Sequence, residues 1–160
     1  MPSKSQLDAV DRKILRLLAS DGRASYQATA DEVGLSRPAV MERVKRLEEA
    51  GYITGYGARL DRAKAGFPVT AFVAVRYANS DYAGQEPQMR AMEQHPGVLE
   101  CHHVAGEDCY ILKVAAPDLE RLQDVLHDLR GSSKLPMSTR TTIVLGTVFE
   151  KPGFVPGEPD

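Results

Sequence analysis

The chain has 160 residues, 42% hydrophobic and 26% charged, a balance typical of a folded globular protein with one large domain or two small ones. It shows neither an apolar run near the ~20 residues that span a bilayer nor a visible signal peptide, so we expect a cytoplasmic protein with no membrane partner. The net charge of −2 divides into +3 over residues 1–66 (12 Lys/Arg, 9 Asp/Glu) and −5 over residues 67–160 (8 and 13), which suggests two modules with different partners.

Three short amphipathic helices are predicted before Gly51. The first follows Asp8, a suitable N-cap, and its apolar residues form one stripe, namely Val10, Ile14, Leu17 and Leu18. The second is expected over Tyr26–Val33 with Ser25 as its cap. A tight turn at Gly34 joins it to the third, which completes a helix-turn-helix unit. None of these helices is long enough to be stable alone, so they must pack against one another.

The third helix, from Ser36 to Gly51, is the most informative stretch of the chain. Ser36 can cap it, Pro38 is tolerated in its first turn, and Gly51 can adopt the left-handed conformation that ends a helix. Its apolar residues fall at i, i+4 and i+7 and share one face: Val40, Val44 and Leu47. The opposite face carries long polar side chains, which suits a recognition helix in the major groove but also an ordinary surface helix.

The residues after Gly51 follow a different pattern. Residues 52–54 and 58–60 are expected to pair as a small hairpin, a wing beside the third helix. Residues 61–66 are typical of one capped helical turn, and we place the domain limit there. The expected domains are a DNA-binding domain with its linker over 1–66, an effector-binding and oligomerisation domain over 67–150, and a flexible or extended tail over 151–160.

The second domain follows the order β-α-β-β-α-β, which is typical of the ferredoxin-like fold. The expected strands are 69–77, 98–105, 108–116 and 138–149, and the expected helices are 86–95, with Pro87 in its first turn, and a helix capped by Asp118 with a stripe of Leu119, Leu122, Leu126 and Leu129. Such an arrangement makes one antiparallel sheet with both helices on one face, so the fold class is α+β. The other face is left bare, which favours oligomerisation.

Two cysteines and two histidines around the predicted hairpin raise a zinc hypothesis, because thiolates and imidazoles are zinc ligands. They are Cys101, His102, His103 and Cys109. With a two-residue turn at 106–107, residue 109 faces residue 104 and shares a face with His102, whereas Cys101 and His103 point to the other side. The four side chains then do not converge, so we expect no metal. In an intracellular protein the cysteines are expected to be thiols.

Short motifs follow one another along residues 7–150: Leu7-Asp8-x-x-Asp11-x-x-Ile14-Leu15, Gly34-Leu35-Ser36, Arg43-Val44-x-x-Leu47-Glu48-x-x-Gly51-x-Ile53, Gly55-Tyr56-x-Ala58-x-Leu60-Asp61 and Val104-x-Gly106-x-Asp108-Cys109-Tyr110. In this order and spacing the chain resembles the Lrp/AsnC family of bacterial and archaeal transcription regulators. The resemblance implies an N-terminal winged helix-turn-helix domain followed by a ferredoxin-like βαββαβ sensing domain. It also implies a homodimer, often assembled to an octamer, that binds double-stranded promoter DNA and responds to an amino acid or related effector bound between dimers, without a cofactor.

Two positions depart from the family's pattern. The family's second helix usually opens Ser-x-x-Glu-Leu-Ala, whereas here Ala28 and Thr29 follow Ser25, so the capping box is lost and a threonine replaces a core leucine. We therefore expect a slightly repacked second helix. The sensing loop often reads Val-Thr-Gly, and here Ala105 removes a hydroxyl that could meet the effector.

For DNA contact, the N-terminal half of a recognition helix usually enters the groove. The residues expected at base edges are Ser36, Arg37, Ala39 and Glu42, and those expected at phosphates are Arg43, Lys45 and Arg46, with Arg59 and Arg62 in or after the wing. The alternative is a solvated charged face. A dimer would place two such helices ~34 Å apart or a multiple of it, so palindromic sites are expected.

The best candidate for the effector site is the turn of the predicted hairpin. Gly106 permits close approach of a ligand to the backbone, and Glu107 and Asp108 could accept hydrogen bonds from an α-ammonium group. The last strand offers hydroxyls at Thr139, Thr141 and Thr142. In the family this loop faces a neighbouring dimer, so the pocket would form only in the octamer. The alternative is an ordinary turn with a solvent-facing acidic pair.

An enzyme is the rival class of function. One heme-pathway decarboxylase group shares this two-domain architecture, and His102 or His103 could serve such a siroheme-decarboxylase-like reaction. The sequence shows no Ser-His-Asp, P-loop or metal-hydrolase motif. A ligand-binding oligomer without DNA contact is a third possibility, against which the arginines of the third helix argue. We predict a sequence-specific, effector-responsive transcription regulator that is not an enzyme.

Overall fold

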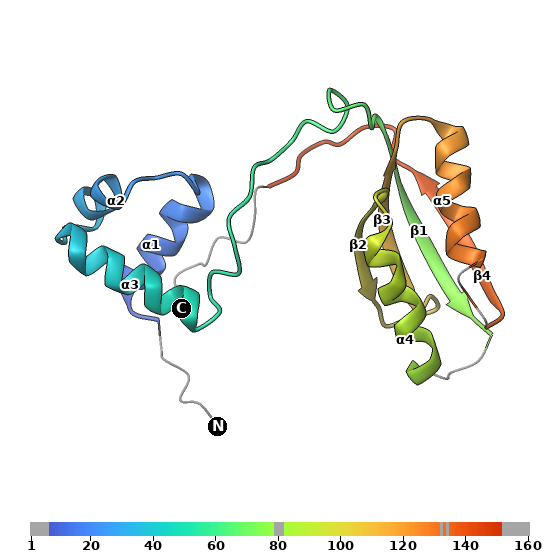
Figure 1. The fold of residues 1–160 in the computed structure, drawn as a ribbon, viewed down its shortest axis with the longest axis horizontal. Coiled ribbons are helices and arrows are strands. Elements are labelled where there is room, and N and C mark those ends of the chain that lie inside the picture. Colours follow the sequence, from blue (N-terminus) through green and yellow to red (C-terminus); the bar gives the residue numbers. More distant parts are fainter. Residues whose placement is uncertain (1–6, 79–81, 132, 134, 152–160) are drawn as a thin grey trace. The chain divides into compact units, whose positions relative to one another are not determined.

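The computed structural model describes residues 7–78, 82–131, 133 and 135–151 (Figure 1). Contacts divide the chain into two compact units, one of Met1–Arg59 with Phe149–Asp160 and one of Leu60–Val148. These limits lie close to those predicted at residues 66 and 150, which stay predictions. Of the tail expected over 151–160, residues 152–160 lie outside the described residues.

The first unit is a bundle of three helices, as predicted: α1 (Ala9–Ser20), α2 (Tyr26–Val33) and α3 (Arg37–Glu49). Its centre consists of residues at most 2% exposed, namely Ile14, Ala30, Val40, Val44 and Leu47. Three of these lie on the predicted face of α3. Burying that face fixes which side of α3 is left to solvent.

Specific caps mark the start of α1 and the end of α3. Asp8 and Asp11 form a reciprocal capping box at the start of α1, in which the Asp11 N–H donates to the Asp8 carboxylate at 2.6 Å. Gly51 has φ +75° after α3, and the Tyr52 N–H donates to the Leu47 carbonyl at 2.9 Å. This is a Schellman motif, so the predicted stop signal of α3 is confirmed.

The second helix accommodates Thr29 at a buried position. Ser25 caps α2 by accepting from the Ala28 N–H at 3.1 Å. Thr29 is only 2% exposed, and its hydroxyl donates to the Ser25 carbonyl at 3.1 Å. That bond satisfies the hydroxyl and allows a polar residue at a core position.

The predicted wing hairpin is wrong for this chain, because residues 53–60 form no strand. A lone two-stranded ribbon has no third strand or helix on which to bury a face. The segment is instead extended and held by Tyr56, whose hydroxyl donates to Glu48 at 2.9 Å. The turn expected after it is present, since Asp61 accepts from the Lys64 N–H at 3.1 Å through its carboxylate and from the Ala65 N–H at 2.9 Å through its carbonyl.

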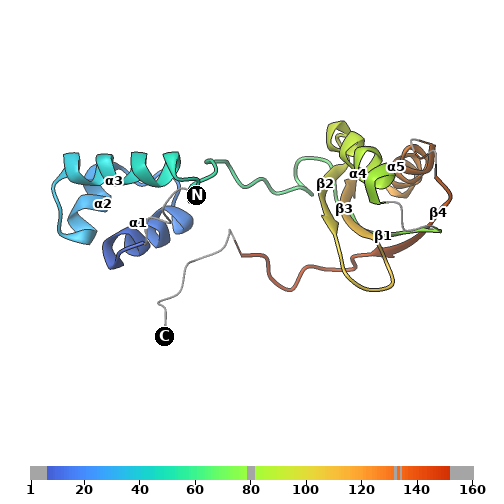
Figure 2. The ribbon, with the colours of Figure 1, turned by 90° about the horizontal axis from the view of Figure 1, so that it is seen from below.

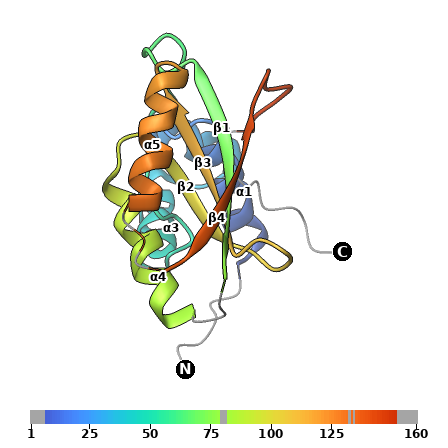
Figure 3. The same ribbon diagram turned by 90° about the vertical axis from the view of Figure 1, so that its right-hand side faces the viewer.

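The second unit has the predicted ferredoxin-like topology. Its elements are β1 (Val69–Tyr77), α4 (Tyr82–Ala91), the short 3₁₀ helix η1 (Met92–Gln94), β2 (Val98–His103), β3 (Tyr110–Ala116), α5 (Leu119–Gly131) and β4 (Met137–Ile143). The strands form one antiparallel sheet in the order β2-β3-β1-β4, and α4 and α5 cover one face of it (Figure 3). The core lies between these layers and includes Val73, Val75, Leu112, Met89 and Leu129.

Several element bounds differ from the sequence prediction, among them β2, which ends at His103 rather than 105, and β3, which begins at Tyr110 rather than 108. α4 begins at Tyr82, so Pro87 lies inside the helix rather than in its first turn, and it deprives the helix of one N–H donor. β4 ends at Ile143 rather than 149, because its partner β1 starts at Val69 and offers no ladder beyond the bond from the Val144 N–H to the Thr70 carbonyl. Leu119 is 57% exposed at the start of α5, and Val125 takes its place in the buried stripe.

Candidate nucleic-acid interface and effector site

The outer face of α3 presents the polar side chains that the sequence singled out. Arg37 and Glu42 are exposed, and Lys45 has a side chain 75% exposed, in a loose ion pair with Glu49 at 3.7 Å. Ala39 is half-buried on the flank of the helix. The structure therefore leaves Glu42 and Lys45 on the side opposite the core and Arg37 exposed at the start of the helix, as expected of a surface that meets a ligand as large as DNA.

Ser36 has a structural task in this chain. Its hydroxyl accepts from the Ala39 N–H at 3.4 Å and caps α3. A hydroxyl also has a proton to donate, so the cap leaves Ser36 able to make one more hydrogen bond.

Arg43 and Arg46 converge on Asp11 of α1, a contact that sequence reasoning missed. The Arg43 guanidinium lies 2.7 Å from the Asp11 carboxylate and 2.6 Å from that of Asp8, and Arg46 lies 2.8 Å from both Asp11 oxygens. Asp11 is only 3% exposed, so this is a buried carboxylate held by two cations. Helical spacing had placed Arg43 on a flank of α3, but only the packing of α1 shows what that flank meets.

The same network shifts two pKa values. The pKa of the Asp8 carboxyl is lowered, first because the Asp11 N–H donates to it and second because Arg43 does. The pKa of Arg43 is raised by its bonds to Asp8 and Asp11. Both shifts favour the charged forms, so the ion pairs between α3 and α1 are present at neutral pH.

The extended segment after α3 adds a second clamp. Burial and the hydrogen bond to Glu48 raise the pKa of Tyr56 to about 12. The Tyr56 ring lies over Gly22, where an added side chain would meet it at 3.7 Å. Arg59, a predicted backbone contact for DNA, donates to the Glu150 carbonyl at 3.1 Å.

In the second unit, the hairpin between β2 and β3 has the predicted register. The carboxylates of Glu107 and Asp108 in its loop are both paired with arginines. The Val104 N–H donates to the Cys109 carbonyl at 3.0 Å, and Gly106 has φ +138°. Arg76 donates to the Glu107 carboxylate at 2.8 Å, and Arg140 to Asp108 at 2.9 Å. The loop thus lies on the face of the sheet away from the helices (Figure 2), and both carboxylates are neutralised by arginines.

The three threonines of the predicted effector site do not meet this loop. They lie on β4, which is the opposite edge of the sheet from β2. Thr139 accepts from Arg130 of α5 at 3.0 Å, which places it on the helix side of the sheet, and Thr141 shares that side by strand alternation. Thr142 faces the other way. Within one chain the six predicted effector residues therefore do not form a single pocket.

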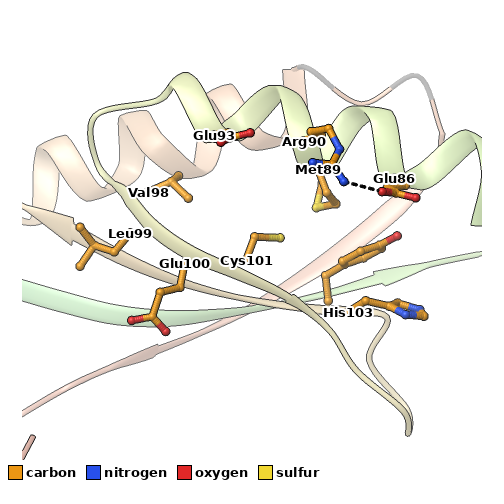
Figure 4. A pocket seen from close by; sticks show the side chains of 10 residues that line it. Glu86, Met89, Arg90, Glu93, Val98, Leu99, Glu100, Cys101 and His103 are labelled. Carbon is orange, nitrogen blue, oxygen red and sulfur yellow. Dashed lines mark hydrogen bonds and ion pairs between the residues drawn. The ribbon is translucent and has the colours of Figure 1, made fainter. Parts of the chain in front are cut away.

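A cavity that the sequence did not suggest lies between α4 and β2 (Figure 4). It has a volume of about 380 Å³ and is lined by Glu86, Met89, Arg90, Glu93, Val98, Leu99, Glu100, Cys101, His103 and Tyr110. Arg90 and Glu86 form an ion pair of 2.8 Å at its rim, above the thioether of Met89. His103 and Tyr110 are the residues at which the β2–β3 hairpin begins and ends, so the cavity adjoins the predicted loop.

His102 lies apart from Cys101 and His103 as predicted, but Cys109, predicted on the face of His102, packs against the core under the helices. Cys101 and His103 line the cavity, and burial raises the pKa of the Cys101 thiol. His102 instead lies 3.1 Å from Glu100, and this contact lowers the pKa of the Glu100 carboxyl. Among the residues that the structure describes, no group of three or more His, Cys, Asp or Glu side chains is placed to hold a metal ion. None of the described helices is both long and apolar enough to cross a membrane.

Two family models cover most of the chain. The one described as winged helix-turn-helix DNA-binding matches residues 7–54, and the one described as the Lrp/AsnC ligand binding domain matches residues 70–154. Among curated proteins, the transcriptional regulator LrpA of Mycobacterium tuberculosis is 36% identical over 94% of this chain and 97% of its own length. The leucine-responsive regulatory protein of Rhizobium meliloti is 34% identical over 92% and 95%.

Solved structures agree with this assignment. The feast or famine regulatory protein of M. tuberculosis complexed with L-methionine matches with a TM-score of 0.84 and 35% identity, covering 94% of this chain and all of the other. A transcriptional regulator of Neisseria meningitidis, also in complex with L-methionine, matches with a TM-score of 0.83 and 26% identity over 91% and 94%. The relatives are transcriptional regulators and not enzymes.

Proposed function

Because the chain belongs to the Lrp/AsnC family of transcriptional regulators, we propose that α3 reads an operator with its exposed face and that an amino acid bound by the second unit modulates this reading. The observation that carries the DNA-reading part is the orientation of α3. Its three core residues are at most 2% exposed, so Arg37, Glu42 and Lys45 all project to solvent. The siroheme-decarboxylase-like alternative has no support among the relatives.

We assign base contacts to Arg37 and Glu42, with Ser36 and Ala39 close to the groove at the start of the helix. Lys45 and Arg59 are assigned to phosphates. Arg46 is 52% exposed and can reach a phosphate while it holds Asp11. Arg43 is only 26% exposed and already meets two carboxylates, so its main role is to orient α3.

The assembly we propose is a homodimer, joined further into an octamer. Its support in this chain is the sheet face that α4 and α5 leave uncovered, where Phe72 is 43% exposed. Two reading helices of a dimer would meet half-sites ~34 Å apart on one side of the duplex.

For the effector, we propose an amino acid with an apolar side chain, of which L-methionine is the example seen in two relatives. The α-amino and carboxylate groups would lie against the hairpin at Gly106, Glu107 and Asp108. The cavity over Met89 and Leu99 lies on the helix side of the sheet, the other side from this loop, and is a second candidate place for the effector. Thr139 and Thr141 would take part only from a neighbouring subunit, because they lie on the helix side of the sheet, whereas Thr142 shares the face of Arg140, which meets Asp108 at 2.9 Å.

The DNA part of the proposal is tested by gel shift on the fragment upstream of the protein's own gene, at stated salt. We expect specific binding that falls steeply as salt rises, as charge neutralisation requires. Absence of binding to any upstream fragment at low salt would refute the proposal.

The effector part is tested by calorimetry with a panel of amino acids. Leu99→Lys replaces an apolar side chain at the wall of the cavity and should weaken L-methionine binding about tenfold, because the effector would lose an apolar contact worth about 1.5 kcal/mol. Leu119→Lys, on the exposed start of α5, is the matched control and should bind normally. Equal affinities in the two variants would remove the cavity from the effector site.

A further inference from the structure

Met41 of α3 is a large apolar side chain that the fold does not bury. It is 43% exposed, whereas its neighbour Val40 is 0% exposed and Val44 is 1% exposed. A single exposed apolar residue is common on protein surfaces, so its position on α3 decides whether it has a role.

Contacts on two sides of α3 fix its rotation about its own axis. Arg43 and Arg46 hold one flank to Asp11 of α1, and Glu48 holds the other flank to Tyr56. Met41 precedes Glu48 by two helical turns and lies on its side of the helix, about 100° from Val40. Met41 is therefore held away from α1 and on the solvent side of the core.

That flank also carries Tyr56, whose ring lies over Gly22 in the turn between α1 and α2. Arg37 and Lys45, both exposed, lie one turn before and one turn after Met41. An apolar side chain thus lies between two cations, on the flank of α3 that Glu48 and Tyr56 occupy.

Base edges in the major groove offer hydrogen-bond donors and acceptors, and one apolar group, the 5-methyl of thymine. A thioether is a weak acceptor and a poor partner for the polar edges, but it packs well against a methyl group. We infer that Met41 is a specificity-determining residue that contacts the 5-methyl group of a thymine in the operator. This inference rests on the proposed reading of DNA by α3.

The test replaces thymine by uracil, which removes the methyl group and leaves every hydrogen-bonding atom in place. The full chain first selects an operator from random, unmethylated duplex DNA, and each thymine of that operator is then changed to uracil in turn. At one thymine of each half-site, uracil should weaken wild-type binding about fourfold, the effect of one buried methyl group.

Protein variants assign that loss to Met41. Met41→Ala should bind the thymine and uracil duplexes equally at this position, and Met41→Leu should keep the preference for thymine. Lys45→Ala is the matched control from the same face, and it should weaken binding to both duplexes by one common factor. Because Met41 is half exposed, the variants should keep the wild-type thermal transition by circular dichroism.

Two outcomes would overturn the inference while the DNA-reading function stands. In one, wild-type protein binds its operator but tolerates uracil at every thymine. In the other, Met41→Ala keeps the preference for thymine. Failure of the chain to select any duplex would instead refute the proposed function, and this inference with it.

Discussion

At the scale of single residues, Asp11 has two structural roles: it helps to cap α1, and it pairs with two arginines of α3. Its carboxylate completes the capping box of α1 and also receives Arg43 and Arg46 of α3, while the residue itself is 3% exposed. A buried carboxylate is tolerated only when it is fully paired. The cap of α1 therefore also fixes the orientation of α3, the helix that we propose reads DNA.

Asp11→Ala should lower the free energy of unfolding of the first unit by about 2–3 kcal/mol, because it leaves two guanidinium groups without their partner. This loss is smaller than that for breaking a fully buried ion pair, because the Arg46 side chain is 52% exposed and water can solvate it. Thermal unfolding of the full chain by circular dichroism measures the loss. Arg37→Ala is the control, and it should leave the transition in place while it weakens operator binding.

Asp8 makes the first unit sensitive to acid. Its pKa is lowered in the folded state, so its contribution to stability is present above the unfolded pKa of about 3.9 and is lost as the pH falls through the folded pKa. Asp8→Asn should flatten this dependence below about pH 4. Unfolding midpoints of both proteins between neutral pH and acid would show it, and parallel pH profiles would contradict it.

At the scale of elements, α3 depends on its C-terminal cap as much as on its apolar face. Gly51 holds φ +75°, and a Cβ there would meet nothing within 4 Å, so any effect of a substitution comes from backbone strain alone. The segment that follows is fastened to α3 by Tyr56 and Glu48. Together these features decide where the helix ends and where the chain leaves it.

Gly51→Ala should destabilise the first unit by about 1 kcal/mol, because a side chain disfavours the left-handed conformation. Gly57→Ala is the matched control, since Gly57 has no positive φ and a Cβ there would also meet nothing. Comparison of their thermal unfolding midpoints tests this, and equal midpoints would show that the Schellman motif carries little of the stability.

The docking of the extended segment predicts an unusual tyrosine titration. The pKa of Tyr56 is raised to about 12, so the stability due to its neutral hydroxyl is complete below the unfolded pKa of about 10 and is lost as the pH rises toward 12. Ultraviolet difference titration of the wild type against Tyr56→Phe should isolate this group. A transition near pH 10 would mean that the segment is free in solution.

At the scale of the whole molecule, the uncovered face of the sheet is the natural place for a second copy of the chain. Phe72 stands on it and is 43% exposed, and the half-buried Ile111 lies on the same side of β3. Burying such a face on a partner removes apolar area from water, and a dimer then supplies the second reading helix that a palindromic operator requires.

Phe72→Glu should shift the chain from dimer or larger assembly to monomer, because it would bury a charge in the interface. Light scattering after gel filtration measures the mass, and operator affinity should fall with it. Leu119→Glu, exposed on the helix side at 57%, is the control and should leave the dimer intact. A Phe72→Glu protein with unchanged mass would exclude this face as the interface.

Local signals in the sequence determined most of the architecture. Apolar spacing, caps and turn residues specified all three helices of the first unit and the βαββαβ order of the second, because these features depend on neighbours within a few residues. The motifs around Ser36, Arg43 and Gly106 were enough to indicate the family. The predicted register of the β2–β3 hairpin agrees with the structure, although six residues rather than a two-residue turn connect the strands.

Tertiary structure decided which side chains are available for function. Arg43 turned out to be paired with Asp8 and Asp11, more than 30 residues away in sequence, and Glu107 and Asp108 to be paired with Arg76 and Arg140. The absent wing, the early end of β4 and the cavity between α4 and β2 likewise depend on which segments meet in space. Periodicity assigns a residue to a face of its own element, but only packing determines what that face contacts.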